Sequence, residues 1–282
     1  MLRLIRVELV KQLRRPRTWV VLAFVILVPI IITIALKTNP PSINDGGGGG
    51  GDGGSRGGGV RFFFLASQSG LLVPIATLRV MSEFFLVVIF CMFAGDSIAS
   101  EAGWGNLRFL LTRPIGRTRL LAAKLIVAAF YAGLATVLII VSGLIAGGIA
   151  FGYEGLDIPI LGLSMSVGSI LAKIALSGVL AAWGIAGIAA FAFMLSTMMD
   201  NSAGAIMGAV GAYVVLSILG AIDSIGPIRY GFPTFYNGAW VDLFRGQSFG
   251  GDMVRNVVAQ VPYIIVFLGI GLWWFRRKDV TS

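Results

Sequence analysis

The chain has 282 residues, of which 57% are hydrophobic and only 12% are charged, and its mean hydropathy is +0.90. Soluble domains carry roughly 25% charged residues, so this composition excludes an ordinary water-soluble fold and predicts a chain that is solvated by lipid. The net charge of +9 raises the question of nucleic-acid binding. The lysines and arginines gather beside apolar runs, as membrane orientation requires, and we therefore expect no nucleic-acid partner.

The chain contains one cysteine, Cys91, and no histidine. No disulfide can form within such a chain, and the commonest general base and metal ligand is missing. A single thiol cannot build a zinc or iron–sulfur site. We therefore expect no catalytic residues, no metal site and no cofactor bound by this chain.

Residues 1–18 are predicted to form a basic amphipathic helix at the membrane surface, because apolar residues recur at spacings of three and four among arginines and a lysine. Pro16 interrupts this helix. The apolar run that follows, at about 19–36, predicts the first span. A cleavable signal peptide is the alternative, but the run is too long and no small-residue cleavage site follows it.

Residues 37–70 are predicted to form a flexible loop on the outer side of the membrane. Within them, residues 46–59 are glycine except at Asp52, Ser55 and Arg56. A glycine run buries no side chains and has a high unfolded-state entropy, which indicates a linker. A phosphate-binding loop would need a lysine that this tract lacks.

Five further apolar runs predict spans two to six, at about 71–95, 125–151, 170–198, 203–222 and 257–275. The predicted fold class is an all-α integral membrane protein with six transmembrane helices, an N-terminal amphipathic elbow helix, and a cytoplasmic coupling helix between spans two and three. Residues 223–256 are expected to form an aromatic-rich outer loop with a short helix. Gly143 and Gly147 form a GxxxG pair, which allows close helix approach.

Three charged residues fall inside the predicted spans. Arg79 and Glu83 lie four residues apart in the second run, on one helical face where they can pair. Lys173 lies near the outer end of the fourth run. Such charges either line a pathway or extend toward the interface, and both interpretations remain open.

The distribution of basic residues predicts the orientation. The segments assigned to the inner side carry fourteen lysines and arginines, and those assigned to the outer side carry six. The positive-inside rule then places both termini in the cytoplasm, and we expect a multi-pass protein of the plasma membrane.

Residues 96–124 are predicted to form a cytoplasmic coupling region. Helix connections usually take roughly 2 to 8 residues, and this segment is much longer. We expect a first short helix that contains Ile98 and Glu101, and a second helical piece at 107–111 that stops before Pro114. Apolar residues such as Trp104 would be exposed in this segment unless they contact a partner surface.

The order of residues in this region resembles the signature of ABC type-2 transporter permeases. The residues that carry the resemblance are Glu101, two glycines, Leu107, Leu110, Leu111, Pro114, Arg117 and Lys124. The likeness extends to the six spans and the basic elbow helix, and so covers nearly the whole chain. Asn106 stands where the family often has threonine, and the glycine tract is a second departure.

The resemblance implies that this region docks on an ATP-binding subunit. The residues expected to couple to that subunit are Glu101, Gly105, Leu107, Arg108, Leu111, Pro114, Arg117 and Lys124. No lysine of this chain follows a glycine, so a Walker A motif is absent and the chain is not expected to be an ATPase itself. ATP and Mg²⁺ would bind to the separate nucleotide-binding subunit.

The function implied by the resemblance is that of a permease subunit in an ATP-driven exporter, such as a multidrug efflux system, paired with an identical or homologous permease. One alternative is a channel or ion-coupled secondary transporter that uses Arg79, Glu83 and Lys173. An integral membrane enzyme is a second alternative, which the missing histidine disfavours. The sequence does not identify the cargo.

Overall fold

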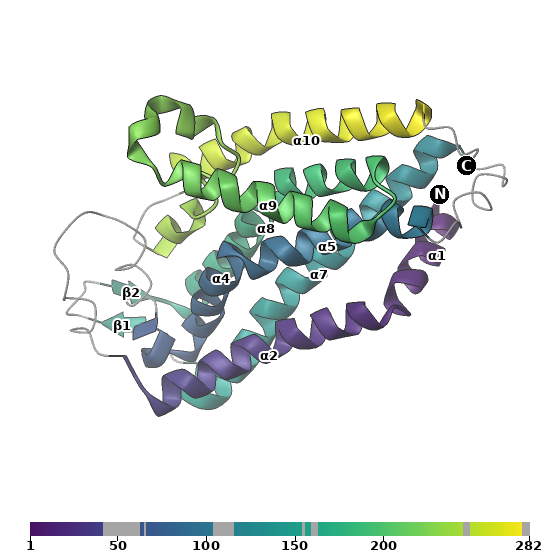
Figure 1. Ribbon diagram of the computed structural model, residues 1–282. Helices are drawn as coiled ribbons and strands as arrows, with labels where there is room; N and C mark the ends of the chain where they lie inside the picture. Colours follow the sequence, from purple (N-terminus) through teal and green to yellow (C-terminus); the bar gives the residue numbers. More distant parts are fainter. Residues whose placement is uncertain are drawn as a thin grey trace. The chain divides into compact units, whose positions relative to one another are not determined.

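The computed structural model is a helical protein (Figure 1) in which residues 1–41, 63–64, 66–103, 116–153, 156–158, 163–244 and 249–277 are described. Its α-helices are α1 (Leu2–Leu13), α2 (Pro16–Thr38), α4 (Val73–Glu83), α5 (Phe85–Gly103), α7 (Arg117–Phe151), α8 (Val167–Met198), α9 (Ser202–Gly220) and α10 (Asp252–Arg277). Short 3₁₀ helices are η2 (Gly70–Leu72), η4 (Asp223–Gly231) and η5 (Ala239–Phe244).

Six helices among the described residues are long and apolar enough to cross a membrane, in agreement with the six predicted spans. They are α2, α5, α7, α8, α9 and α10. Pro16 is the first residue of α2, a position where proline is favoured because its missing N–H has no helical acceptor. This proline separates α2 from the short basic helix α1.

The second predicted span differs from the structure. The segment expected as one helix over about 71–95 is divided at Phe84, whose φ of −146° and ψ of −55° are not helical. The first piece, α4, has 11 residues and a length of about 16 Å, which is too short to cross a hydrocarbon core of roughly 30 Å. The candidate span is α5, which begins after the break.

The structure also differs from the prediction at both ends of the expected coupling region, residues 96–124. Residues 96–103 do not form a separate short helix, because α5 continues through them to Gly103. Likewise α7 begins at Arg117 rather than near residue 125. The second helical piece expected at 107–111 and the exposed Trp104 lie outside the described residues, as does the glycine tract at 46–59.

A small antiparallel hairpin interrupts the all-α fold that the sequence predicted. Strands β1 (Leu156–Ile158) and β2 (Leu163–Met165) pair with Asp157 opposite Ser164. Strands of three residues are too short to show a period-two pattern, so they were not predicted from the sequence.

The chain divides into two compact units. The first comprises residues 1–18, 85–134 and 180–282, and the second comprises residues 19–84 and 135–179. In the second unit, an added Cβ on Gly143 would lie 3.0 Å from the Cα of Pro74. The first glycine of the predicted GxxxG pair therefore allows α7 to approach α4 closely.

In the first unit, α5 packs against α8 and α9. An added Cβ on Gly95 would lie 3.0 Å from Ile206 on α9. From α8, the fully buried Ser196 hydroxyl accepts hydrogen bonds from the backbone N–H groups of Ile98 and Ala99, at 3.0 and 2.9 Å. This contact fixes the last two turns of α5 against α8.

We expect Ser196→Ala to lower stability by about 0.5–1.5 kcal/mol, because it removes the buried hydrogen bonds between α8 and α5, while the N–H groups of Ile98 and Ala99 keep their carbonyl acceptors within α5. The measurement is thermal unfolding of the purified protein in detergent. Ser97→Ala is the matched control, since the Ser97 hydroxyl donates to Ala94 O in its own helix. Equal shifts in Tm for the two variants would contradict this assignment.

Candidate functional site

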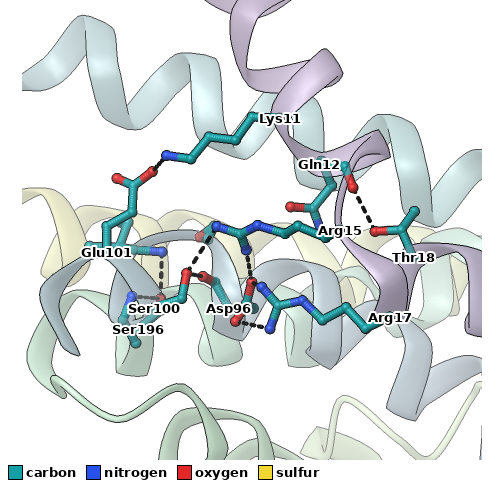
Figure 2. Close-up of polar contacts among 12 residues, drawn as sticks. Lys11, Gln12, Arg15, Arg17, Thr18, Asp96, Ser100, Glu101 and Ser196 are labelled. Carbon is teal, nitrogen blue, oxygen red and sulfur yellow. Dashed lines mark hydrogen bonds and ion pairs between the residues drawn. The ribbon is translucent and has the colours of Figure 1, made fainter. Parts of the chain in front are cut away.

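A cluster of seven charged side chains joins α1 and the start of α2 to the end of α5 and the start of α7, all within the first unit. We call it the charge cluster, and Figure 2 shows most of it. Its acidic members are Glu8, Asp96 and Glu101, and its basic members are Lys11, Arg15, Arg17 and Lys124.

Asp96 forms the first half of the charge cluster. Its side chain is 1% exposed and makes ion pairs with both Arg15 and Arg17 (Figure 2). Arg15 also donates to the Ser100 hydroxyl at 3.3 Å. A buried carboxylate is stable only when it is paired and hydrogen-bonded, and guanidinium groups supply several donors in a fixed geometry. Asp96 therefore fixes the α1–α2 junction against α5.

Glu101 forms the second half. Its side chain is 2% exposed and pairs with Lys11 and Lys124, with 2.7 Å between Glu101 Oε1 and Lys124 Nζ. Lys124, which is 4% exposed, also donates to Glu8 Oε2 at 3.2 Å. The four side chains thus alternate in sign, and they join α1, α5 and α7 without leaving a buried charge unpaired.

The spacing on α5 explains how a short stretch of the N-terminal segment can pair with it. Asp96 and Ser100 lie four residues apart on α5 and therefore face the same side of that helix. Arg15 lies in the bend between α1 and α2 and contacts both of these side chains. Lys11 lies within α1 and pairs with Glu101, which follows Ser100 on α5.

Uncharged contacts extend the same junction. The Tyr131 hydroxyl on α7 donates to Leu9 O on α1 at 2.8 Å, and the Tyr131 ring stacks on Phe93 of α5 at 5.5 Å between centroids. A polar cavity of about 20 Å³ lies beside Glu8, Arg15 and Lys124. That volume has room for about one water molecule, which polar walls can hold.

The residues predicted to couple to a partner fall into three groups. Glu101 and Lys124 lie together in the charge cluster and are buried, so neither offers a free surface for docking. Arg117 donates to Phe275 O at 3.4 Å and to Arg276 O at 3.0 Å. It thereby links the start of α7 to the end of α10. Five further residues lie outside the described part of the chain: Gly105, Leu107, Arg108, Leu111 and Pro114.

Most of the charge cluster was not predicted from the sequence. A usable signal was present, because Glu8 is the only acidic residue before residue 45 and only Asp96 and Glu101 are acidic between residues 96 and 124. Isolated carboxylates among many basic residues are the natural partners for them. The pattern could not show which basic residue each carboxylate would contact.

The charges expected within the membrane occupy the second unit. Arg79 and Glu83 form the predicted pair, with 2.7 Å between their charged atoms, but they lie on α4 and the Glu83 side chain is 57% exposed. Lys173 is half-buried on α8. Among the described residues, no group of three acidic, cysteine or histidine side chains could hold a metal ion.

We expect Glu101→Gln to destabilise the protein by about 3–5 kcal/mol, because it leaves the buried Lys124 ammonium without full compensation. The double variant Glu101→Gln/Lys124→Gln should be less destabilised than the sum of the two single variants, since the pair is coupled. Thermal unfolding in detergent measures all three variants.

Arg255→Gln is the matched control for this cycle. It removes one charge of the exposed Arg255–Asp252 pair and should change stability by less than about 1 kcal/mol. Strict additivity of the two substitutions in the charge cluster would show that Glu101 and Lys124 do not act as a pair.

Comparisons with known proteins give the family but no activity. A family model described as "Protein of unknown function (DUF2705)" matches residues 56–281, a range that contains five of the six candidate spans. A Bacillus subtilis (strain 168) protein called "Uncharacterized protein YhcI" is 24% identical over 219 residues, which is 73% of this chain and 67% of that protein. Neither description states what the protein binds or transports.

Proposed function

The chain belongs to the DUF2705 family, and we propose that it is the transmembrane permease subunit of an ATP-driven ABC exporter. In this proposal it forms the substrate pathway with a second permease copy or homologue. Separate ATPase subunits bind ATP and Mg²⁺ and dock at residues 96–124. The protein lies in the plasma membrane with both termini in the cytoplasm.

The observation that carries the proposal is the position of the charge cluster. It joins α1 to the two helices, α5 and α7, that end and begin on either side of residues 104–115. A docking segment can transmit force only if the helices that flank it are held firmly. Buried ion pairs that are each hydrogen-bonded supply that firmness, because breaking one leaves an unpaired buried charge.

The continuity of α5 and α7 suggests how the coupling works. Since α5 runs unbroken from Phe85 to Gly103, a displacement at its end moves the whole candidate span. ATP-driven movement of the motor subunits would then shift the protein between inward-open and outward-open states, through contacts that differ between those states. The charge cluster would keep α1, α5 and α7 moving together.

The resemblance gives all eight coupling residues one role, and we propose two different tasks for them. Gly105, Leu107, Arg108, Leu111 and Pro114 are proposed to contact the ATPase. Glu101, Lys124 and Arg117 are proposed to hold the base of that segment. Glu101 and Lys124 are buried and pair with each other and with α1, and Arg117 contacts α10. Multidrug efflux is one form that such export takes.

A channel or ion-coupled transporter is the second candidate, and the ion pair between Arg79 and Glu83 is the observation that favours it. Charged residues near the membrane interior are functional candidates by default. These two side chains neutralise each other within one helical turn, which also stabilises α4 without any transport role. Co-purification with an ATPase separates the two candidates.

We expect the tagged protein, extracted in mild detergent, to co-purify with a polypeptide that carries a Walker A motif. Arg108→Ala should reduce the amount of this ATPase several-fold and leave Tm unchanged, because Arg108 is proposed to touch the partner. Arg255→Gln, an exposed charge removal on α10, is the control. An unchanged ATPase yield with Arg108→Ala, or no ATPase with any variant, would contradict the proposal.

The proposed orientation is tested by thiol labelling in a Cys91→Ser background, since Cys91 is the chain's one cysteine. Ser224→Cys on η4 and Arg119→Cys on α7 replace two exposed side chains. A membrane-impermeant maleimide applied to intact cells should label position 224 and not position 119, and lysis should expose both. Labelling of position 119 in intact cells would show that the topology is the reverse of the proposed one and that residues 96–124 do not face the cytoplasm.

A further inference from the structure

An apolar groove of about 460 Å³ lies between α2 and the last third of α7, entirely within the second unit. Its walls are formed mainly by isoleucines: Ile26, Ile30, Ile34, Ile145 and Ile149. A volume of this size lies within the roughly 300–1,000 Å³ of small-molecule sites. The groove is therefore large enough for a specific ligand.

The two hydroxyl groups in the groove do not make its walls polar. Thr33 donates to Pro29 O, and Ser142 donates to Leu138 O, each in its own helix. Both donors are thereby used, which leaves the groove an environment for hydrocarbon. The occupant must accordingly present an apolar chain along most of its length.

Of the residues that the structure describes, Lys37 is the one charged residue that lines the groove. It lies in the last turn of α2 and its side chain is exposed. Among the described residues, no carboxylate forms an ion pair with it. The described walls of the groove are thus apolar except for one positive charge at its end, which an anion would complement.

The length of the groove matches one leaflet of a bilayer. Ile26 and Lys37 are eleven residues apart on α2, which corresponds to roughly 16 Å along the helix axis. The hydrocarbon core of a bilayer is roughly 30 Å thick, so one leaflet contributes about half of that. With Lys37 at the headgroup level, the isoleucines line the depth that an acyl chain occupies.

We propose that this groove is a binding site for a phospholipid with a negatively charged headgroup. One acyl chain lies along the isoleucines, and the headgroup phosphate pairs with the Lys37 ammonium. The apolar walls supply affinity for the chain, and Lys37 supplies selectivity for anionic over zwitterionic headgroups. The site is independent of residues 96–124, so it does not rest on coupling to an ATPase.

A second copy of the chain fits the groove less well than a lipid does. In a two-fold symmetric contact between membrane proteins, equivalent residues of the two copies lie at the same depth. Two Lys37 side chains would then lie at one level with no described carboxylate to pair with either of them, and like charges oppose such a contact. A phospholipid supplies the missing negative charge.

The test uses photoactivatable phospholipids with the reactive group in the acyl chain, reconstituted with the protein in nanodiscs. Phosphatidylglycerol should label peptides of α2 and the end of α7 more than phosphatidylcholine does. Lys37→Gln should reduce the preference for phosphatidylglycerol about fivefold, as expected for loss of one basic residue at a membrane surface. Ala146→Trp, which fills the groove, should reduce labelling by both lipids.

Two matched controls accompany these variants. Arg255→Gln removes a cation that already has a carboxylate partner, and Val215→Trp adds the same ring to an exposed position on α9. Neither should change labelling of the groove. Equal labelling by the two lipids in the wild-type protein, or an unchanged preference in Lys37→Gln, would overturn the proposal.

Disulfide crosslinking tests whether a second copy of the chain occupies the groove instead of a lipid. Ile145→Cys and Ile149→Cys, each in the Cys91→Ser background, place a thiol on the groove wall. Under mild oxidation in the membrane we expect monomers for both. Efficient crosslinking of two copies at these positions would show that a second chain covers the groove, and the lipid proposal would then be wrong.

Discussion

Two carboxylates buried in an apolar helix bundle impose the strongest constraint on this structure. Asp96 and Glu101 are 1% and 2% exposed, and neither could be buried without opposite charges beside it. The partners come from a different part of the chain, at Lys11, Arg15 and Arg17. The two carboxylates of α5 therefore determine where α1 and the α1–α2 junction lie, because they must be paired with these basic side chains.

This constraint changes the description of the basic N-terminal helix. A helix held only by lipid headgroups could slide and rotate along the interface. Here one set of cations on residues 1–18 is used by α5, while Arg3, Arg6 and Arg14 are exposed. The basic residues of this segment thus have two roles. Some pair with carboxylates of α5, and the exposed ones remain available to anionic headgroups. Any movement of α5 must carry α1 with it or break buried ion pairs.

The sequence predicted the features that depend on neighbouring residues. Each span follows from a local run of apolar residues, so the fifth run at 203–222 became α9 (Ser202–Gly220) with little change. The pair Arg79–Glu83 was predicted for the same reason, since one helical turn fixes its spacing. The break at Phe84 was missed, because the apolar residues on both sides of it form one run.

Features that depend on distant residues were not predicted in the same way. Lys11 and Glu101 are separated by 90 residues, and Arg17 and Asp96 by 79. Charge composition can show that a carboxylate needs a cation, but only the packing of α1, α5 and α7 selects which one. Glu101 was predicted to couple to a partner subunit, and the structure buries it between two lysines.

The positive-inside argument remains compatible with this internal use of charge. Orientation is set by lysines and arginines that flank each span as the chain enters the membrane, and at that stage residues 1–18 cannot pair with α5. Once the helices pack, Arg15, Arg17 and Lys124 exchange water and headgroup contacts for carboxylates. The same residues can therefore direct insertion first and hold the bundle afterwards. Lys37 has no carboxylate partner among the described residues and remains available to pair with the proposed phospholipid.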